Sequence, residues 1–295
     1  MLCSLVSNGV ALHREQPDAV VPWWSFTKTV LAAAALSLVR DGLIGLDDLV
    51  AEGPFSLRQL LQHQAGLADY SELADYPAAV AAGDAPWAAE AMLQRLDAAR
   101  LRYRPGTQWR YSNVGYLFVA QLIERLTGLP LEQAVEQRVL APLAVPGVFF
   151  ARSRADLENV SRGVAPGYDP GWVYHGLLVG PLSGAALLLD RLLGGPLLPP
   201  ALREEMQRPL VLSGPIPGRP WVAPGYALGL MVGVAEGGLT LCGHRGCGPG
   251  STVAIYRATQ GAHTASCAVF IDGDDQIGAE AHALRLLSAS LASIG

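Results

Sequence analysis

Residues 23–40 read Trp-Trp-Ser-Phe-Thr-Lys-Thr-Val-Leu-Ala-Ala-Ala-Ala-Leu-Ser-Leu-Val-Arg. From residue 29 to 40 the stretch is rich in Ala, Leu and Val, and Asp41-Gly42 follows as a stop signal. We therefore expect a helix with Ser25 at its mouth. Residues three apart lie on one face of a helix, so Ser25 and Lys28 can touch.

Lys28 is the one lysine of the chain, since every other cationic side chain among its 21 Lys and Arg residues is Arg. Arg replaces Lys well wherever only solvation or a salt bridge is needed, so this exception indicates a specific task. A Lys amine can be brought toward neutrality by burial and neighbouring charge, whereas Arg keeps its proton. A plainer interpretation stays open, in which Ser25 is a helix N-cap and Lys28 a solvated residue.

The middle of the chain predicts helices. Periodic apolar patterns broken by Gly and Pro indicate helical stretches over residues 57–63, 85–100, 115–127 and 131–140. Residues 147–220 are richer in Pro and Gly, and we expect long loops over a cleft there, with helices around 185–193 and 200–207.

The two ends of the chain predict strands. Residues 2–13, with Asn8-Gly9 in the middle, are typical of a hairpin. Toward the C-terminus, alternating segments with Gly-rich turns predict an antiparallel meander over 227–234, 239–242, 251–256 and 266–271, and a closing helix over 277–291. Hairpin and meander can join one sheet and leave the helical part as an insertion.

The expected fold class is therefore α+β: an antiparallel sheet flanked by helices, with an inserted, mainly helical lobe. We expect residues 1–24 and 221–295 to form the sheet domain. Residues 25–220 are expected to form the helical lobe and the cleft loops, with the Ser25–Lys28 helix at the interface.

Composition narrows the class of protein. The chain has 295 residues, 51% of them hydrophobic, and a formal net charge of −5, which suits a large core and no nucleic-acid partner. No apolar stretch reaches the length of a membrane span and the N-terminus lacks the features of a secretory signal, so we expect a soluble, cytoplasmic protein without a membrane partner. Four scattered cysteines predict reduced thiols rather than a disulfide framework.

Three separated clusters fit one mechanism. They are Ser25-Phe26-Thr27-Lys28, Tyr111-Ser112-Asn113 and His244-Arg245-Gly246, the last at the end of a predicted strand. In this order the chain resembles the serine β-lactamase and penicillin-binding-protein superfamily, specifically its branch of class C β-lactamases, family VIII esterases and D-aminopeptidases. The resemblance covers most of the chain and includes residues 42–48, 57–67, 103–106 and 111–116.

The resemblance implies a β-lactamase/transpeptidase-like fold and an acyl-enzyme on Ser25, without a cofactor. A serine hydroxyl is a poor nucleophile until a base takes its proton, and Lys28 can be that base. Tyr111 is implied as a second catalytic group, and a phenolate flanked by a cationic amine has a lowered pKa. Which of Lys28 and Tyr111 is the primary base stays open. Asn113 is implied to hold Lys28 and to donate to a substrate carbonyl.

The third cluster is implied to bind the substrate. The backbone N–H groups of Ser25 and Cys247 would form the oxyanion hole. Gly246 would allow close substrate approach, because a side chain there would block the strand edge. His244 and Arg245 stand where many penicillin-recognising members carry Lys and a hydroxyl residue, so His244 favours an esterase-like site, although Arg245 can still recognise a carboxylate.

We therefore expect a serine hydrolase of the carboxylesterase type, acting on a small-molecule ester, amide or β-lactam. The alternatives with the same machinery are a β-lactamase, a D,D-peptidase or a D-aminopeptidase. A non-catalytic binding module and an acyltransferase on the same fold are further alternatives. The sequence leaves the oligomeric state open.

The remaining cysteines and histidines are not assigned to catalysis or to a metal site. Cys242, His244 and Cys247 lack a fourth ligand at a suitable spacing, so we expect no metal. His175 can line the cleft but is left out of the catalytic set. The remaining histidines are interpreted as structural or surface groups, namely His13, His63, His263 and His282. The chain has no Gly-x-Ser-x-Gly motif, which argues against an α/β-hydrolase.

Overall fold

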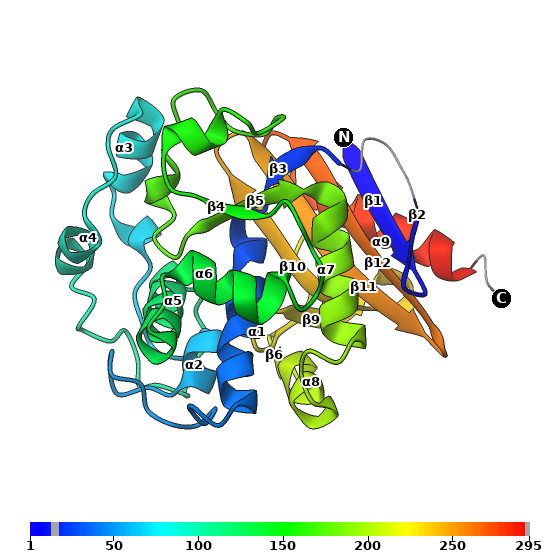
Figure 1. Ribbon diagram of the computed structural model, residues 1–295, viewed down its shortest axis with the longest axis horizontal. Coiled ribbons are helices and arrows are strands. Elements are labelled where there is room, and N and C mark those ends of the chain that lie inside the picture. Colours follow the sequence, from blue (N-terminus) through cyan, green and yellow to red (C-terminus); the bar gives the residue numbers. More distant parts are fainter. Residues whose placement is uncertain (13–17, 293–295) are drawn as a thin grey trace.

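A computed structural model describes residues 1–12 and 18–292, and a large antiparallel sheet forms its centre (Figure 1). The strand order is β2-β1-β12-β11-β10-β9-β8-β6, with β7 paired to β9. In chain order the strands are β1 Leu2–Ser7, β2 Val10–Leu12, β6 Leu210–Val211, β7 Trp221–Ala223, β8 Gly225–Tyr226, β9 Met231–Ala235, β10 Thr240–Gly248, β11 Ser251–Gln260 and β12 His263–Asp272. Helices flank this sheet, so the predicted α+β fold class is confirmed.

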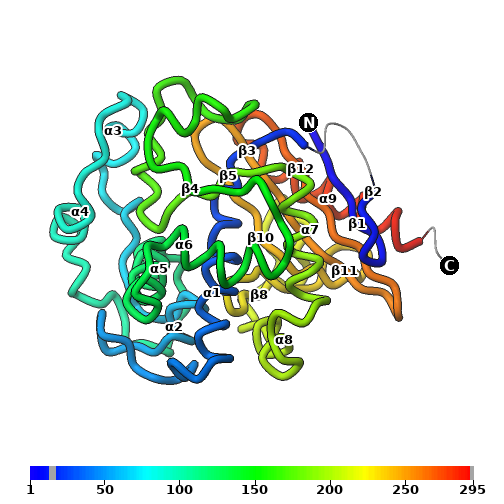
Figure 2. Tube along the Cα trace, viewed as in Figure 1, coloured from blue at the N-terminus to red at the C-terminus, as the bar shows by residue number. Residues whose placement is uncertain are grey.

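The two ends of the chain meet in the sheet, as the sequence predicted. Strands β1 and β2 form an antiparallel hairpin, and Asn8 at its turn has a φ of 47°. Such a positive φ suits the tight hairpin turn that Asn-Gly favours. On its other side β1 pairs with β12, and Figure 2 shows the two strands, blue and orange, side by side. His13, the last residue of the predicted hairpin, lies outside the described residues.

Helices α7, Leu182–Gly194, and α9, Gln276–Ala292, cover opposite faces of the sheet (Figure 1). Successive side chains of a strand point to opposite faces, and β12 divides accordingly. Cys267 and Val269 pack in a cluster with α9, whereas Ala268 and Phe270 pack in the larger core that includes α7. Helix α7 lies within the region assigned to the lobe, and the division of the chain into two domains stays a prediction.

The helical lobe follows the predicted pattern with one addition. Its helices are α2 Leu57–Leu61, α3 Tyr76–Ala82, α4 Ala89–Arg95, α5 Asn113–Thr127 and α6 Leu131–Val135, the last continued by a π-helical turn over Glu136–Leu140. Helix α3 was not predicted. It begins with Pro77 in its first turn and ends at Gly83, which has a φ of 71°. The helix predicted over residues 85–100 is shorter than expected.

Helix α1, Thr27–Arg40, is the central helix of the molecule. Every residue from Thr27 to Leu38 is buried, which is typical of a helix that is apolar on all sides. A 3₁₀ turn over Trp24–Phe26 precedes it. The helix begins two residues earlier than predicted and carries Ser25 at its mouth, as expected.

A second, three-stranded sheet was not predicted. It consists of β3 Val20–Pro22, β5 Leu177–Pro181 and β4 Phe149–Ala151, in the order β3-β5-β4. Its strands are short and far apart in sequence, so local patterns gave no sign of their pairing. The predicted long loops over 147–220 are therefore partly wrong, although the two helices expected there exist as α7 and α8, Pro200–Gln207.

The C-terminal strands differ from the prediction in two places. The strand expected over 227–234 begins only at Met231 as β9, because residues 227–230 form a turn after β8 in which Gly229 has a φ of 74°. Strand β10 is longer than expected and contains the whole cluster His244-Arg245-Gly246. Within residues 1–12 and 18–292, no helix has the length and apolar character needed to cross a membrane.

Candidate active site

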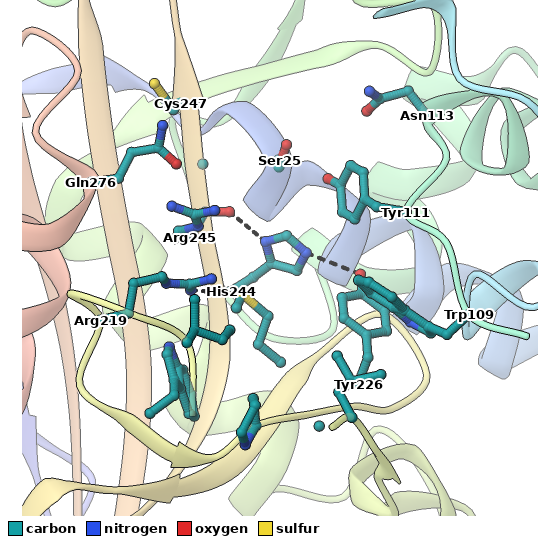
Figure 3. Close-up of a pocket in the computed structure, with 17 residues that line it drawn as sticks. Ser25, Trp109, Tyr111, Asn113, Arg219, Tyr226, His244, Arg245, Cys247 and Gln276 are labelled. Atoms are coloured by element: carbon teal, nitrogen blue, oxygen red, sulfur yellow. Dashed lines mark hydrogen bonds between the residues drawn. The ribbon is translucent and has the colours of Figure 1, made fainter. Parts of the chain in front are cut away.

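The three sequence clusters meet around one cavity of about 650 Å³ (Figure 3). Ser25 comes from the turn before α1, Tyr111 and Asn113 come from the start of α5, and β10 supplies the third cluster. The remaining wall comes from the segments around β6 to β9. Its lining residues there are Leu212, Ile216, Arg219, Trp221, Pro224, Gly225, Tyr226 and Met231, and Trp109, Cys247 and Gln276 from other segments also line the cavity.

The backbone around Ser25 is held in an unusual conformation. Trp24, directly before it, has a φ of 45°, which costs a bulky residue about 1–3 kcal/mol and persists only where packing enforces it. The Trp24 indole N–H donates to Ser251 Oγ at 2.9 Å, and its ring packs edge-on against Tyr168. These contacts fix the turn that points Ser25 toward the cavity.

Gly246 and Gly248 let β10 approach this turn. A Cβ on Gly246 would lie 2.6 Å from the backbone nitrogen of Ser25, and one on Gly248 would lie 2.4 Å from the Trp24 ring. The prediction for Gly246 named the substrate as the group that needs the space. In the structure, the nucleophile's own turn occupies it first, so Gly246 brings the Ser25 backbone and β10 together.

Lys28 lies beside Ser25 and is fully buried. Its Nζ is 3.3 Å from Ser25 Oγ, and its side chain has 0% exposure. Burial lowers the pKa of Lys28 to about 7, although the Asp69 carboxylate partly counteracts this. The amine also lies 5.1 Å from the centre of the Tyr111 ring. The expected desolvated lysine is therefore present, and much of it is neutral near pH 7.

The second hydrogen-bonding partner of Lys28 is His175. Its Nε2 lies 3.1 Å from Lys28 Nζ, and the histidine is 2% exposed. From the sequence, His175 was not expected among the catalytic residues, and Asn113 was expected to hold the lysine. Among the described residues, the hydrogen-bonding partners of Lys28 Nζ are Ser25 and His175, so the expected contact with Asn113 is absent.

Asn113 is the first residue of α5 and lines the cavity. Its backbone N–H donates to the buried carboxylate of Asp69, and Figure 3 shows its side chain set apart from Ser25. The predicted bond from Asn113 to a substrate carbonyl stays a prediction.

The hydroxyl of Tyr111 points toward Ser25 and lies beside it (Figure 3). Burial raises its pKa well above the ordinary value of tyrosine, while a hydrogen bond with Ser25 acts in the opposite direction. The expectation of a lowered pKa is therefore wrong. A partly neutral Lys28 provides little positive charge, and desolvation of the phenolate outweighs it. Tyr111 is a neutral phenol at pH 7.

His63, expected from the sequence to be a structural or surface residue, lies beside Tyr111. It is 2% exposed, and its ring centre lies 4.3 Å from that of Tyr111. Its Nδ1 accepts the backbone N–H of Ser112 at 3.2 Å, which fixes the segment that carries Tyr111. Its place in the leucine-rich stretch of residues 57–67 was the available signal.

His244 lines the cavity, but both of its nitrogens are engaged within the protein. Nδ1 contacts the backbone oxygen of Arg245, which can only accept, so Nδ1 carries the proton. Nε2 then accepts from the Tyr226 hydroxyl at 3.0 Å. Burial lowers the pKa of His244 to about 3, so the ring is neutral and offers no charge to a substrate.

The charges at the cavity come from two arginines. Among the described residues, its lining includes the guanidinium groups of Arg245 and Arg219 and no carboxylate. Arg219 is paired with Glu280. Cys247 follows Gly246 and also lines the cavity, where its backbone N–H stays a candidate for the oxyanion hole. Within this part of the chain, no group of three or more His, Cys, Asp or Glu side chains is arranged to hold a metal ion.

A comparison with known proteins gives one family match and several relatives. The model of the family described as Beta-lactamase matches residues 7–284. A D-aminopeptidase of Brucella ovis is 29% identical over 136 residues, which are 44% of this chain and 26% of that protein. The match thus spans about a quarter of the length of this curated relative.

Solved structures share the fold. The D-amino acid amidase from Ochrobactrum anthropi SV3 has a TM-score of 0.80 at 22% identity, covering 100% of this chain and 94% of that chain. A penicillin binding protein from Bacillus halodurans has a TM-score of 0.77 at 16% identity, covering 97% of this chain and 96% of that chain. The likeness extends over the whole sheet and lobe, which agrees with the architecture described above.

Proposed function

This chain belongs to the beta-lactamase family, within the serine β-lactamase and penicillin-binding-protein-like superfamily, and from that premise we propose that it is a serine hydrolase whose nucleophile is Ser25. The observation that carries the proposal is the contact of 3.3 Å between Ser25 Oγ and the buried amine of Lys28. A serine needs a neighbouring base, and this lysine has lost much of its preference for the charged form.

Lys28 is the primary base in this proposal. With a pKa of about 7, a large fraction of its amine is neutral near pH 7 and can take the Ser25 proton. As that O–H bond breaks, Oγ forms a bond to the substrate carbonyl carbon, and the carbonyl oxygen becomes an oxyanion. The backbone N–H groups of Ser25 and Cys247 stabilise the oxyanion.

Tyr111 acts as a neutral hydroxyl in the same cycle. Its raised pKa favours a role in passing a proton over a role as a resting phenolate. When the tetrahedral intermediate collapses, the bond to the leaving group breaks and the leaving nitrogen or oxygen receives the proton held by Lys28, directly or through Tyr111. Water then attacks the acyl carbon while Lys28 accepts a proton from it. When this second tetrahedral intermediate collapses, the bond between Ser25 Oγ and the acyl carbon breaks, Lys28 returns the proton to Oγ, and the carboxylic acid is released.

The first substrate class is an amide of a D-amino acid. The support comes from the relatives, which include a D-aminopeptidase and a D-amino acid amidase. This replaces esters as the leading candidate, although esters use the same machinery.

A second candidate is an ester or amide whose acyl part carries no ammonium group. A free α-ammonium is best bound by a carboxylate, and the described cavity lining has two guanidinium groups and none of the acidic side chains. Arg245 favours a neutral or anionic acyl group. The second candidate therefore covers carboxylesters and peptides that end in a carboxylate near the scissile bond.

The nucleophile is tested with a fluorophosphonate probe on the intact protein. We expect one label per chain, at Ser25, and no label on Ser25→Ala, with Ser183→Ala as a matched control that labels normally. Failure of the wild-type protein to label, or equal labelling of Ser25→Ala, would favour a non-catalytic module on the same fold.

The substrate class is tested with a D-amino-acid p-nitroanilide in free and N-acetylated forms, p-nitrophenyl butyrate and a chromogenic cephalosporin. Highest kcat/KM on the free D-anilide supports the first candidate. Preference for the acetylated anilide or the ester supports the second candidate. In that case Arg245→Gln should lower kcat/KM for anionic substrates roughly tenfold and leave turnover of p-nitrophenyl butyrate near its original rate. Added alcohols or amines that appear in the product would instead indicate an acyltransferase.

A further inference from the structure

We propose that His175 is a positioning residue for Lys28: its Nε2 accepts a hydrogen bond from the lysine amine and so keeps that amine beside Ser25 Oγ while the lysine carries the serine proton. The inference rests on the proposed roles of Ser25 and Lys28. Among the described residues His175 does not line the cavity, and its hydrogen bond is with the Lys28 amine, so its effect on Ser25 and the substrate passes through the lysine.

The segment that carries His175 is fastened to the nucleophile's own turn. The backbone N–H of Leu178, on β5, donates to Thr27 Oγ1 at 3.1 Å. The backbone N–H of Trp23 donates to the Leu178 oxygen at 2.8 Å. These two bonds tie β5 to both sides of Ser25, so the distance between His175 and Lys28 is set by backbone contacts.

The loop before β5 has little freedom to move the ring away. Gly176, next to His175, has a φ of 90°, and its N–H donates to the Val173 oxygen at 2.7 Å. A Cβ on Gly176 would lie 2.7 Å from the Phe150 ring. The chain is therefore closely packed at the point where it turns His175 toward α1.

Lys28 has few other groups to stabilise its charge. The amine is enclosed by the aromatic faces of Tyr111 and Tyr116, at 5.1 and 5.7 Å from their ring centres. The Asp69 carboxylate is the charged group that raises the pKa of Lys28, whereas the neighbouring His63 and His244 are buried and neutral. Ser25 Oγ is the atom that reacts, so His175 Nε2 is the lasting hydrogen-bond acceptor for the ammonium.

The donors and acceptors of the two side chains decide which of them donates in the hydrogen bond between Lys28 and His175. An ammonium has donors and no acceptor, so His175 Nε2 accepts when Lys28 is charged, and the ring is then protonated on Nδ1. When Lys28 is neutral, its amine donates one hydrogen bond to His175 Nε2. The lone pair of the amine is then free to point at Ser25 Oγ. Burial and the neighbouring Lys28 lower the pKa of His175 well below its ordinary value, which keeps the ring neutral.

Proton transfer leaves His175 unchanged. The Ser25 O–H bond breaks, an N–H bond forms on Lys28, and the histidine neither gains nor loses a proton. Its Nδ1 is buried and has no protein partner among the described residues, unlike Nδ1 of His244, which contacts the Arg245 oxygen. No carboxylate on Nδ1 raises the basicity of His175, so it stays an acceptor and does not become the base.

The chain offers a direct test because Lys28 is its only lysine. Protein grown on lysine labelled with ¹³C at Cε gives a single lysine side-chain signal, whose shift against pH reports the pKa of Lys28 without reference to activity. We expect the midpoint of this titration to fall by about one unit in His175→Leu, because the ammonium loses its acceptor.

Two further variants separate hydrogen bonding from packing. The amide of Gln reaches the position of Nε2, whereas the shorter Asn reaches only that of Nδ1. We expect His175→Gln to keep the midpoint near that of the wild type and His175→Asn to lower it as His175→Leu does. The comparison of His175→Gln with His175→Asn decides the question even if His175→Leu does not fold. His263→Leu, on the remote β11–β12 hairpin, is the matched control, and it should change neither the NMR midpoint nor the rate of Ser25 acylation.

Acylation of Ser25 should be roughly tenfold to a hundredfold slower in His175→Leu and His175→Asn than in the wild type. The apparent pKa of the acid limb in the pH profile should fall by the same amount as the NMR midpoint. Equal midpoints in all folded variants would overturn the inference. A His175-dependent midpoint in a protein that never labels at Ser25 would keep the Lys28–His175 contact and reject the proposed hydrolase.

Discussion

Two basic side chains lie close to the catalytic cavity, Lys28 beside Ser25 and Arg219 in the cavity lining, and the protein holds them in opposite ways. The Arg219 guanidinium donates to both oxygens of Glu280, a fully buried carboxylate, and its pKa is raised by that partner. Among the described residues no carboxylate forms a salt bridge with Lys28, and burial lowers its pKa to about 7. A paired cation keeps its proton and supports structure, while an unpaired buried lysine is prepared to exchange one.

The surroundings of Glu280 reinforce this difference. Its carboxylate also accepts from the Tyr256 hydroxyl at 2.7 Å and from the Trp221 indole N–H at 3.2 Å. The network joins α9, β11 and the cavity wall. Such an arrangement satisfies a buried ion pair, and nothing equivalent surrounds Lys28, whose partners are the nucleophile and a neutral imidazole.

The largest expected effect comes from Lys28→Arg. The charge is kept, but a guanidinium does not release its proton, so we expect acylation of Ser25 to fall roughly 10³-fold or more. The measurement is the rate of fluorophosphonate labelling, with the fold checked by circular dichroism. Arg100→Lys, in an exposed pair with Asp97, is the reverse exchange at a neutral site and should label at the wild-type rate. Normal labelling of a folded Lys28→Arg protein would remove the lysine from the role of base.

Glu280→Gln tests the other cation. It leaves the Arg219 charge buried beside a neutral amide, which should lower the free energy of unfolding by about 3 kcal/mol. Urea denaturation measures this loss, and the double variant Arg219→Met with Glu280→Gln should recover part of it. The NMR midpoint of Lys28 should stay unchanged in both. A stability within about 0.5 kcal/mol of the wild type would mean that the pair is not the structural element described here.

The pH dependence of kcat/KM separates the two cations in activity. The neutral Lys28 amine is the reactive form, so kcat/KM should be constant above about pH 8 and fall tenfold per pH unit below the Lys28 pKa of about 7. Arg219 keeps its proton over this whole range and contributes no step. An acid limb centred near pH 4 to 5 would point to a carboxylate as the titrating group and contradict the assignment.

The parts of the site predictable from the sequence were those that depend on local spacing. Ser25 and Lys28 lie one helical turn apart, so their contact follows from helix geometry alone. The strands of the C-terminal meander were predicted for the same reason, since period-two patterns are local. The second sheet was missed because β3 pairs with β5 across more than 150 residues.

The features of the site that the sequence did not predict depend on tertiary packing. The raised pKa of Tyr111 follows from desolvation of its side chain by tertiary packing, which no spacing in the sequence reveals. His175 approaches Lys28 across 147 residues of chain, and its neighbours in sequence form no recognisable motif. Gly246 was identified correctly as a point of close approach, but the neighbouring group turned out to be the Ser25 backbone.

The smallest expected effect is a gain in stability on removing the catalytic amine. The pKa of Lys28 is about 7 in the folded protein and about 10.4 in an unfolded chain, so between these values the unfolded chain binds more protons. Stability contributed by this group therefore rises with pH from about 7 to about 10, and the buried lysine is most costly at pH 7 and below.

Lys28→Met keeps an unbranched side chain and removes that cost. We expect the free energy of unfolding at pH 7 to rise by about 1 kcal/mol, less than the pKa difference alone implies because the contacts with Ser25 and His175 are lost, and the gain should disappear toward pH 10. Urea denaturation at pH 7 and pH 10 measures it. Arg219→Met should instead lose stability at both pH values. If Lys28→Met also loses stability at pH 7, the two cations are both structural and the contrast between them fails.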